Sequence, residues 1–304
     1  VQTIGMVGLG KMGLNLSLRL KEKGWHVVGY NRSALAIEGM TMADSLPSLP
    51  SLPSLPSLVE RLPSPRIIWL MIPHQAVDAT LFGKTGLASL LHRGDIVIDG
   101  GNSYYKDSIR RAKKLNAKGI RFIDVGVSGG PGGARSGPSL MVGGQRRDVE
   151  QIQHLFLDLA LPDGYQFFPG HGAGHFVKMI HNGIEYGMMQ ALAEGFAILK
   201  KSSFKLDLTK VAEVYNHGSV IESRLMEWLR SGLVLHGPDF KGVSGTVAHT
   251  GEGEWTVKTA KALKIQTKII EASLQFRKLS TKRPSYTGKI LSALREQFGG
   301  HASR

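Results

Sequence analysis

The sequence predicts an α/β fold in which a doubly wound parallel sheet is followed by an all-helical domain. Short apolar strands alternate with helical stretches through the first half of the 304-residue chain, which is the pattern of a parallel sheet covered by helices. A glycine-rich turn directly follows the first strand, and strand signals fade after about Gly170. We therefore expect a sheet domain over residues 1–172 and a helical domain over residues 173–304.

Short apolar runs predict the strands, and helical spacing of apolar residues predicts the helices. The expected strands are Thr3–Val7, His26–Tyr30, Arg66–Ile72, Asp95–Asp99, Arg121–Val125 and Ser139–Gly143. The expected helices are Lys11–Lys23, His175–Lys201, Leu208–Tyr215, Ser219–Ser231, Glu254–Leu263, Thr267–Leu279 and Ser285–Phe298.

A low-complexity insert interrupts the sheet domain at residues 45–58. It repeats the triplet Ser-Leu-Pro four times and ends in Ser57-Leu58. Because repeated proline removes backbone donors and forbids a regular helix, we expect this stretch to be extended or turn-like. A neutral expansion in a surface loop is favoured over a polyproline ligand for a partner domain.

Composition sets the broad class. Hydrophobic residues make up 42% and charged residues 20%, which is ordinary for a globular protein. No apolar run approaches the ~20 residues that span a bilayer, and the start lacks the pattern of a signal peptide, so a cytoplasmic address is expected. The absence of cysteine excludes disulfides, thiolate metal sites and a cysteine nucleophile.

The net charge of +14 is the strongest compositional signal. It is concentrated at the end, where residues 255–304 hold eleven Lys or Arg against two Glu. A nucleic-acid binder would place such charge beside stacking aromatics or on a recognition helix, and neither pattern is present. A solvated helical surface and a site for an anion both remain open.

A glycine motif follows the first predicted strand and opens the first helix. It reads Gly8-Leu9-Gly10-Lys11-Met12-Gly13. In this context G-x-G-x-x-G predicts a Rossmann-type dinucleotide site rather than a simple glycine-rich turn. Gly8 would permit the tight turn, Gly10 would let backbone N–H groups approach the pyrophosphate, and Gly13 would let helix and strand pack closely.

The end of the second strand bears on the choice between NAD and NADP. An NAD site usually has a carboxylate there for the ribose 2′-hydroxyl, whereas this chain has Asn31-Arg32-Ser33. Arg32 offers a planar fork for a 2′-phosphate, with Asn31 and Ser33 as neutral donors. The sequence predicts NADP, with NAD as a weaker alternative.

Two further strands end in small polar turns. These are Asp99-Gly100-Gly101-Asn102-Ser103 and Asp124-Val125-Gly126-Val127-Ser128-Gly129-Gly130. Ligands of open α/β sheets lie beyond the carboxyl ends of strands, so Asn102 and Ser128 are candidates to bind hydroxyls or a carboxylate.

The predicted helix from His175 carries three polar groups on one face. At about 100° per residue, Asn182 lies about 40° from Lys178 and Glu185 about 20° on the other side, and His181 flanks this face. A solvated Lys–Glu face is the simpler interpretation. The segment is otherwise apolar, however, so we expect burial to lower the pKa of Lys178 and raise that of Glu185, as acid/base catalysis requires.

Together these motifs resemble decarboxylating 6-phosphogluconate dehydrogenase, in its short form. The residues that carry the resemblance are Gly8–Gly13, Asn31-Arg32-Ser33, Asp99–Ser103, Val127–Gly130 and Lys178-x-x-His181-Asn182-x-x-Glu185-Tyr186. The resemblance runs from about residue 3 to the end, interrupted by the insert. It implies oxidation of a phosphorylated sugar acid by NADP with loss of carbon dioxide, as in the pentose phosphate pathway, without a metal.

The resemblance also implies roles for single residues. Lys178 would be the base that takes the proton of the substrate's 3-hydroxyl, and Glu185 the acid that protonates C1 of the enediol. The substrate would be held by Asn102, Ser128, Gly129, Gly130, His181 and Asn182, and its phosphate by Tyr186 and Arg277. Asn102 would also touch the cofactor.

In the family the carboxyl-terminal tail reaches the active site of the other subunit, so Arg295 and His301 are expected to bind substrate across a homodimer. This chain departs from the family at Thr250, where the long form has Lys, and at Glu254, which is more often basic. The departures put one phosphate contact in doubt.

Two other functions remain open at this stage. Another β-hydroxyacid dehydrogenase, such as one for 3-hydroxyisobutyrate, shares the glycine loop, the Ser-Gly-Gly turn and the Lys. It does not need Glu185 as a second acid or Arg277 for phosphate. A non-catalytic NADP-binding protein would not need the set of Lys178, Asn182 and Glu185.

Overall fold

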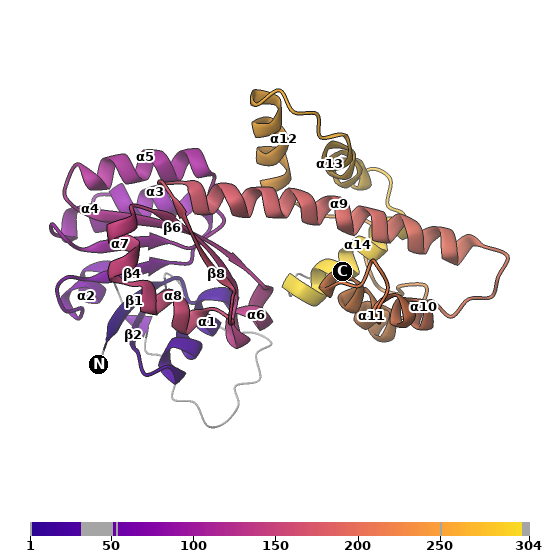
Figure 1. Cartoon of the computed structure of the whole chain (residues 1–304), viewed down its shortest axis with the longest axis horizontal. Coiled ribbons are helices and arrows are strands. Elements are labelled where there is room, and N and C mark those ends of the chain that lie inside the picture. The colour runs from indigo at the N-terminus through magenta and orange to yellow at the C-terminus, as the bar shows by residue number, and fades with distance from the viewer. Residues whose placement is uncertain (1, 32–50, 53, 250, 300–304) are drawn as a thin grey trace. The chain divides into compact units, whose positions relative to one another are not determined.

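The computed structural model describes residues 2–31, 51–52, 54–249 and 251–299. The chain divides into two compact units, Val1–Lys178 and Met179–Arg304. The division falls within one long helix, six residues after the boundary expected from the sequence. Figure 1 shows strands and short helices in the first unit and only helices in the second.

The first unit is built on an eight-stranded sheet with the order β3-β2-β1-β4-β5-β6-β7-β8. Its strands are β1 (Thr3–Val7), β2 (His26–Tyr30), β3 (Ser51–Leu52), β4 (Ile67–Leu70), β5 (Ile96–Asp99), β6 (Arg121–Ser128), β7 (Ser139–Gly144) and β8 (Tyr165–Pro169). The chain builds outward from β1 to β3 and then returns to β4 on the other side of β1. The carboxyl ends of β1 and β4 therefore meet at a topological switch point, where such folds bind ligands.

The predicted fold class is confirmed, and all six predicted strands are present. The sequence analysis missed β3 and β8, and it did not foresee that β7 runs antiparallel to β6. The remaining ladders of the described sheet are parallel.

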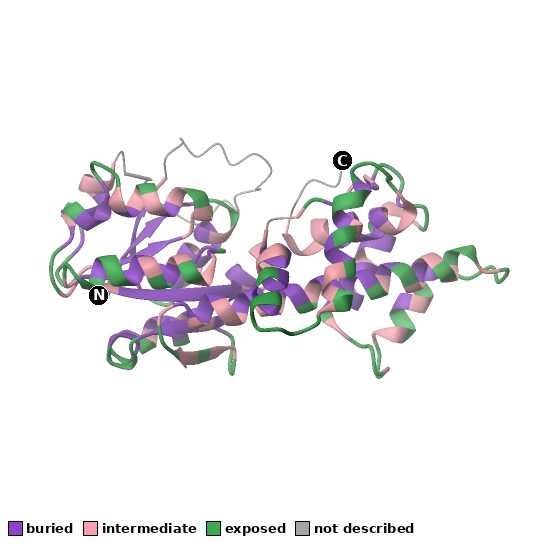
Figure 2. Cartoon of the chain, turned by 90° about the horizontal axis from the view of Figure 1, so that it is seen from above, coloured by how far each residue is buried: buried purple, intermediate pink, exposed green. Residues whose placement is uncertain are grey.

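Helices cover both faces of this sheet, and successive residues of a strand are buried under opposite layers of helices. They are α1 (Lys11–Glu22), α2 (Leu55–Glu60), α3 (His74–Phe82), α4 (Leu87–Leu90), α5 (Tyr105–Asn116), α6 (Gly130–Ser136), α7 (Arg146–Gln151) and α8 (Gln153–Leu159). On β5, Ile96 and Ile98 pack in the core with α1, α6 and α8, whereas Val97 packs in the core with α2 to α5. Strands buried on both faces need continuous apolar runs, and the central strands β1, β4, β5 and β6 are buried along most of their length (Figure 2).

The end of the Ser-Leu-Pro insert is folded, which corrects the expectation of a surface loop. Ser51–Leu52 pairs with β2, and α2 begins at Leu55. Ser54 caps this helix by accepting a hydrogen bond from Ser57 N at 3.2 Å. Proline is tolerated in the first turn because its missing N–H would have no partner there, and Leu58 is 0% exposed. Residues 45–50 and 53 of the insert lie outside the described residues.

The second unit is helical, as predicted. Its helices are the remainder of α9 (Ala173–Lys201), α10 (Leu208–Tyr215), α11 (Arg224–His236), α12 (Glu252–Ala262), α13 (Lys268–Ser280) and α14 (Tyr286–Gly299). Its core packs α9, α10, α11 and α14 around Met226, Phe240 and Leu291, among others. The helix expected at Ser219–Ser231 begins five residues later, because the Ser223 hydroxyl accepts from Met226 N at 3.1 Å and caps it there.

The described residues show neither a membrane-spanning helix nor a cluster of metal-binding side chains. None of the helices found there combines the length and the apolar character that a bilayer span requires. The same residues hold no group of three or more His, Asp or Glu side chains placed to bind a metal ion.

Because the last part of the insert is packed, its leucine should matter for stability. We expect Leu58→Ala to lower the free energy of unfolding by about 2–5 kcal/mol, as for other fully buried leucines. The matched control is Leu157→Ala on α8, where the side chain is 59% exposed and the change should stay within about 0.5 kcal/mol. Urea unfolding followed by circular dichroism measures both, and equal stabilities would show that α2 does not pack as described.

Candidate active site

The glycine loop lies between β1 and α1 and leaves space for a bound pyrophosphate. Gly8 has φ +96°, and a Cβ there would lie 2.4 Å from Met71 O. A Cβ on Gly13 would lie 1.9 Å from Gly8 O, whereas one on Gly10 would meet nothing within 4 Å. The first and third glycines thus allow the turn to pack on itself, and the second leaves the start of α1 open. These features fit a dinucleotide bound at the amino end of α1.

Asn31 completes this loop. Its side-chain Oδ1 accepts a hydrogen bond from Leu9 N at 3.2 Å, so the end of β2 is tied to the glycine turn. A neutral amide at this place leaves no carboxylate to repel a phosphate. Arg32 and Ser33 lie outside the described residues, as do Thr250 and His301.

The candidate residues Asn102 and Ser128 follow adjacent strands. Asp99, the last residue of β5, pairs with Asp124 of β6. The two strands are parallel, so their carboxyl ends lie at the same edge of the sheet. Asn102 is exposed there, and Ser128 ends β6. Gly129 follows with φ +133°, which favours glycine, and starts α6.

The start of α9 lies directly against the backbone of β6 and β7. A Cβ on Gly126 would lie 2.3 Å from Lys178 Cβ, and one on Gly174 would lie 2.3 Å from Met141 O. A Cβ on Gly143 would lie 2.4 Å from Gly174 N. The helix approaches this closely only because these three side chains are missing. Lys178, which is 8% exposed, therefore lies beside Gly126 of β6. Gly126 is two residues before Ser128.

A buried carboxylate fixes the same helix end. Asp124 accepts hydrogen bonds from Gly172 N at 2.6 Å and from His175 N at 2.9 Å, which are among the first N–H groups of α9. These groups have no partner within the helix, and negative charge at a helix amino terminus is favourable. The sequence analysis quoted Asp124 only as part of a turn. The signal it missed is an acidic residue two places before the glycine that the helix packs on.

The next turns of α9 carry the other predicted groups. Asn182 is buried, and its Oδ1 lies 3.0 Å from His181 Nδ1. The same nitrogen lies 3.7 Å from Glu185 Oε2. His181 thus lies within hydrogen-bond distance of Asn182 and near Glu185, beside the face that the helical spacing predicts for Asn182 and Glu185.

A buried arginine, Arg277, lies beside Tyr186 in the helical unit, and the half-buried Arg295 is near it. Arg277 is 1% exposed, and its guanidinium lies 3.6 Å from the centre of the Tyr186 ring. Within the described part of the chain its only hydrogen-bond acceptor is Met189 Sδ at 3.5 Å, and no carboxylate pairs with it. Burial lowers the pKa of Arg277 to about 10, so the group stays charged at neutral pH. Arg295 lies near enough to add to this positive field, and burial also lowers the pKa of Arg295.

Arg295 lies within the helix that the sequence predicts near the end of the chain. This helix, α14, continues to Gly299 and buries Leu291 and Leu294 in the core of the helical unit. Arg295 interacts electrostatically with Tyr186 and Glu252 of its own chain. Its expected contact with the substrate of a partner subunit stays a prediction.

Glu254, one of the departures from the family pattern, is paired. Its Oε1 lies 2.5 Å from Lys278 Nζ, and this hydrogen bond lowers the pKa of Glu254. The negative charge is thus offset by the residue that follows Arg277.

Comparison with known proteins agrees with this architecture of a nucleotide-binding sheet domain joined to a helical domain. A family model for the NAD binding domain of 6-phosphogluconate dehydrogenase matches residues 3–165. A second model, for the C-terminal domain of 6-phosphogluconate dehydrogenase, matches residues 174–295.

Relatives and a solved structure support the same assignment. YqeC of Bacillus subtilis, named as a provisional 6-phosphogluconate dehydrogenase, is 43% identical over 99% of this chain and 98% of its own length. The NAD(+)-dependent, decarboxylating 6-phosphogluconate dehydrogenase of Haloferax volcanii is 38% identical over 98% and 97%. The solved 6-phosphogluconate dehydrogenase of Plasmodium falciparum is 29% identical with a TM-score of 0.79, covering 92% of this chain and 62% of the longer one. The chain belongs to the 6-phosphogluconate dehydrogenase family.

The close approach of α9 to the sheet can be tested with two glycines of that helix. We expect Gly174→Ala to lower the free energy of unfolding by about 1–3 kcal/mol, because the new methyl group would collide with a backbone carbonyl. Gly195→Ala is the matched control, since a Cβ there meets nothing within 4 Å and should stabilise by about 0.5–1 kcal/mol. Urea unfolding measures both. A stable Gly174→Ala protein would contradict the packing described for the first turn of α9.

Proposed function

We propose that this protein oxidises 6-phosphogluconate with NADP and releases carbon dioxide, giving ribulose 5-phosphate. The observation that carries the proposal is the buried Arg277. Leaving a buried charge unpaired costs several kcal/mol, so this guanidinium indicates an anionic ligand group. Arg277 presents a planar fork suited to a phosphate, with Arg295 close by.

The proposed chemistry divides between two residues of α9. NADP, held by the glycine loop and the start of α1, would supply the acceptor for the substrate's hydride. Lys178 would take the proton of the 3-hydroxyl and, once protonated, stabilise negative charge on the 3-keto oxygen as carbon dioxide leaves. Glu185 would then donate a proton to C1. Asn182 and His181 would hold hydroxyl groups, and Asn102, Ser128, Gly129 and Gly130 would bind the rest of the sugar acid.

The cofactor preference is proposed from the end of β2. Asn31 is neutral and tied to the glycine loop, and Arg32 follows it in the sequence. A charge-assisted contact to a 2′-phosphate is worth roughly 1.5–3 kcal/mol, which is about one to two decades in kcat/KM. The NAD(+)-dependent relative from Haloferax volcanii makes a direct comparison necessary.

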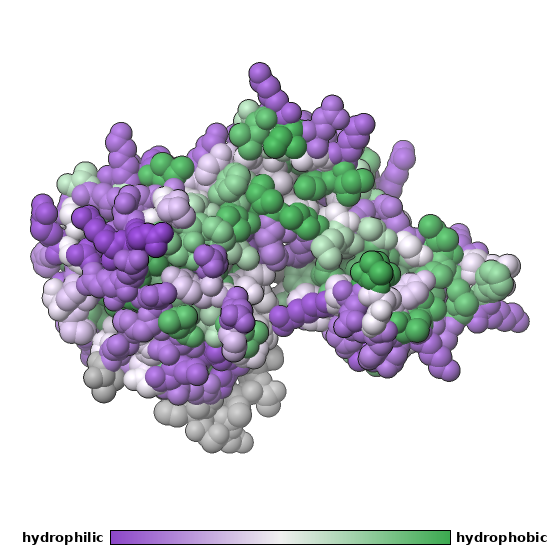
Figure 3. Space-filling view, in the orientation of Figure 1, coloured by the Kyte–Doolittle hydropathy of each residue, from purple (hydrophilic) through white to green (hydrophobic). Residues whose placement is uncertain are grey.

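A homodimer is also proposed. Large apolar side chains are exposed on the helical unit, among them Ile198 at 72%, Phe204 at 73% and Ile269 at 70%. Figure 3 shows such green side chains on the surface of this unit. Apolar surface of this kind is often covered by a second copy.

The reaction itself is tested by following both products. We expect the protein to form NADPH and carbon dioxide in equal amounts from 6-phosphogluconate, with a higher kcat/KM for NADP than for NAD. Lys178→Met should lower kcat by about a hundredfold or more while NADP binding, measured by calorimetry, is kept. Lys201→Met, exposed at the end of the same helix, is the control and should retain activity.

Other product patterns would point elsewhere. NADPH without carbon dioxide would indicate another β-hydroxyacid dehydrogenase. Binding of NADP without turnover of any such substrate would indicate a non-catalytic protein.

The role of Arg277 is tested by removing its charge. We expect Arg277→Met to raise KM for 6-phosphogluconate by about 10- to 150-fold, the equivalent of a charge-assisted hydrogen bond. Turnover of unphosphorylated gluconate, assayed at high concentration, should change far less. The control is Arg283→Met, which removes an exposed arginine just beyond α13. Equal losses with both substrates would rule out Arg277 as a phosphate ligand.

A further inference from the structure

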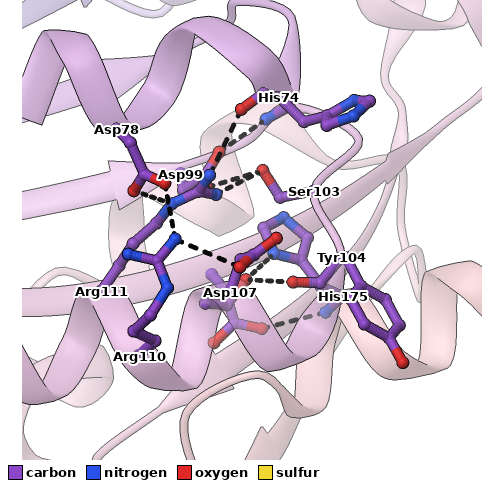
Figure 4. Close-up of polar contacts among 12 residues, drawn as sticks. His74, Asp78, Asp99, Ser103, Tyr104, Asp107, Arg110, Arg111 and His175 are labelled. Atoms are coloured by element: carbon purple, nitrogen blue, oxygen red, sulfur yellow. Dashed lines mark hydrogen bonds and ion pairs between the residues drawn. The ribbon is translucent and has the colours of Figure 1, made fainter.

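Helix α5 carries two buried polar side chains, each bonded to a different part of the candidate site (Figure 4). Ser108 is 0% exposed and Arg111 is 2% exposed. They lie three residues apart and therefore on the same side of the helix. Neither residue belongs to the motifs from which the function was proposed.

Arg111 holds the loop that contains Asn102. Its Nη1 donates to Asp99 Oδ2 at 3.2 Å and to Ser103 Oγ at 3.0 Å. The Ser103 hydroxyl donates to the same Asp99 oxygen at 2.8 Å, and Gly101 N donates to the other at 3.3 Å. Both neighbours of Asn102 are thus anchored to one buried ion pair, while Asn102 itself remains exposed.

The other nitrogens of Arg111 reach the helix that follows β4. Nε donates to Asp78 Oδ1 at 3.0 Å, and Nη2 donates to the backbone oxygen of His74 at 3.2 Å. Both acceptors belong to α3, whose first residue is His74. One planar guanidinium therefore joins the start of α3 to the loop after β5.

Ser108 connects α5 to the start of α9. Its Oγ lies 2.7 Å from His175 Nδ1 and 3.5 Å from Tyr104 O. His175 is 1% exposed, and its Nε2 has no partner in the described structure. The Ser108 hydroxyl donates to Tyr104 O, so its oxygen can also accept from Nδ1–H of His175 in the tautomer that carries the proton there.

His175 lies one turn before Lys178 on α9, and its backbone N–H is held by Asp124. The first turn of α9 is therefore fixed from two sides, by β6 through Asp124 and by α5 through Ser108.

We propose that Ser108 and Arg111 are positioning residues that hold the Asn102 loop and the Lys178 helix in one fixed geometry. The proposal rests on the proposed function, because it assigns the two residues to the same reaction. Neither would touch substrate or cofactor. A displacement of about 1 Å at reacting groups can cost about a hundredfold in rate, which is the size of effect that such a framework prevents.

The adjacent arginine offers a matched control. Arg110 also pairs with Asp78, at 2.5 Å, and with Asp107 at 3.1 Å, but its side chain is 41% exposed and it does not contact the Asn102 loop. Arg111→Lys replaces the fork by one ammonium group that cannot reach four acceptors. Arg110→Lys makes the same exchange at a residue that shares Asp78 but does not contact the Asn102 loop. Ser108→Ala removes only one hydroxyl.

Steady-state kinetics with 6-phosphogluconate and NADP, well below the melting temperature, give the first measurement. We expect Arg111→Lys and Ser108→Ala to lower kcat by about ten- to a hundredfold, with both KM values changing less than about threefold. Arg110→Lys should keep kcat within about twofold. In the double variant kcat should fall by less than the product of the two single fold-changes, because both substitutions loosen the same arrangement of catalytic groups.

Hydrogen exchange followed by mass spectrometry gives a measurement that does not need turnover. Exchange should speed up in residues 99–104 for Arg111→Lys and in residues 172–178 for Ser108→Ala, and in neither for Arg110→Lys. If the wild-type protein shows no turnover, the proposed function fails, and the exchange pattern still decides whether the framework exists. Unchanged kcat in folded Ser108→Ala and Arg111→Lys proteins, or unchanged exchange, would overturn the proposal. If Arg111→Lys does not fold, Ser108→Ala alone decides it by the same measures.

Discussion

The contact between the first turn of α9 and the backbone of β6 and β7 determines where the polar groups of the first unit lie. Three missing side chains, at Gly126, Gly143 and Gly174, allow the helix to approach the sheet. The buried Asp124 then satisfies two of its free N–H groups. Packing without Asp124 would leave buried donors unpaired, and Asp124 without the glycines would have no helix within reach. Both conditions together place Lys178 beside the end of β6.

The two buried arginines Arg111 and Arg277 have different partners. Arg111 is paired with Asp99 and Asp78 and uses each of its nitrogens, so its burial costs little and makes the surrounding loops rigid. Arg277 is buried to the same degree, but an aromatic ring and a thioether sulfur take the place of a carboxylate. The first arrangement pairs every nitrogen of the guanidinium. The second has no carboxylate at ion-pair distance among the described residues, and the proposed phosphate contact is based on this difference.

The errors of the sequence analysis have physical causes. Repeated proline suggested that the insert could not be regular, yet proline fits the first turn of a helix, and the nearby Leu58 finds a place in the core. The helix predicted from Ser219 begins at Arg224, because a serine hydroxyl caps it at Ser223.

The sequence by itself predicted six of the eight strands, the glycine loop, and the shared helical face of Lys178, Asn182 and Glu185 with His181 beside it. These features depend on spacings of a few residues, which the fixed geometry of strands and helices converts directly into positions. Only the tertiary structure decided that Asp124 caps α9, that Arg111 joins the start of α3 to the loop after β5, and that Arg295 lies near Arg277. The bond from Asp124 to His175 spans 51 residues and that from Arg111 to His74 spans 37. No local periodicity reports such pairs, because they form only when separate elements pack and their buried polar groups must find partners.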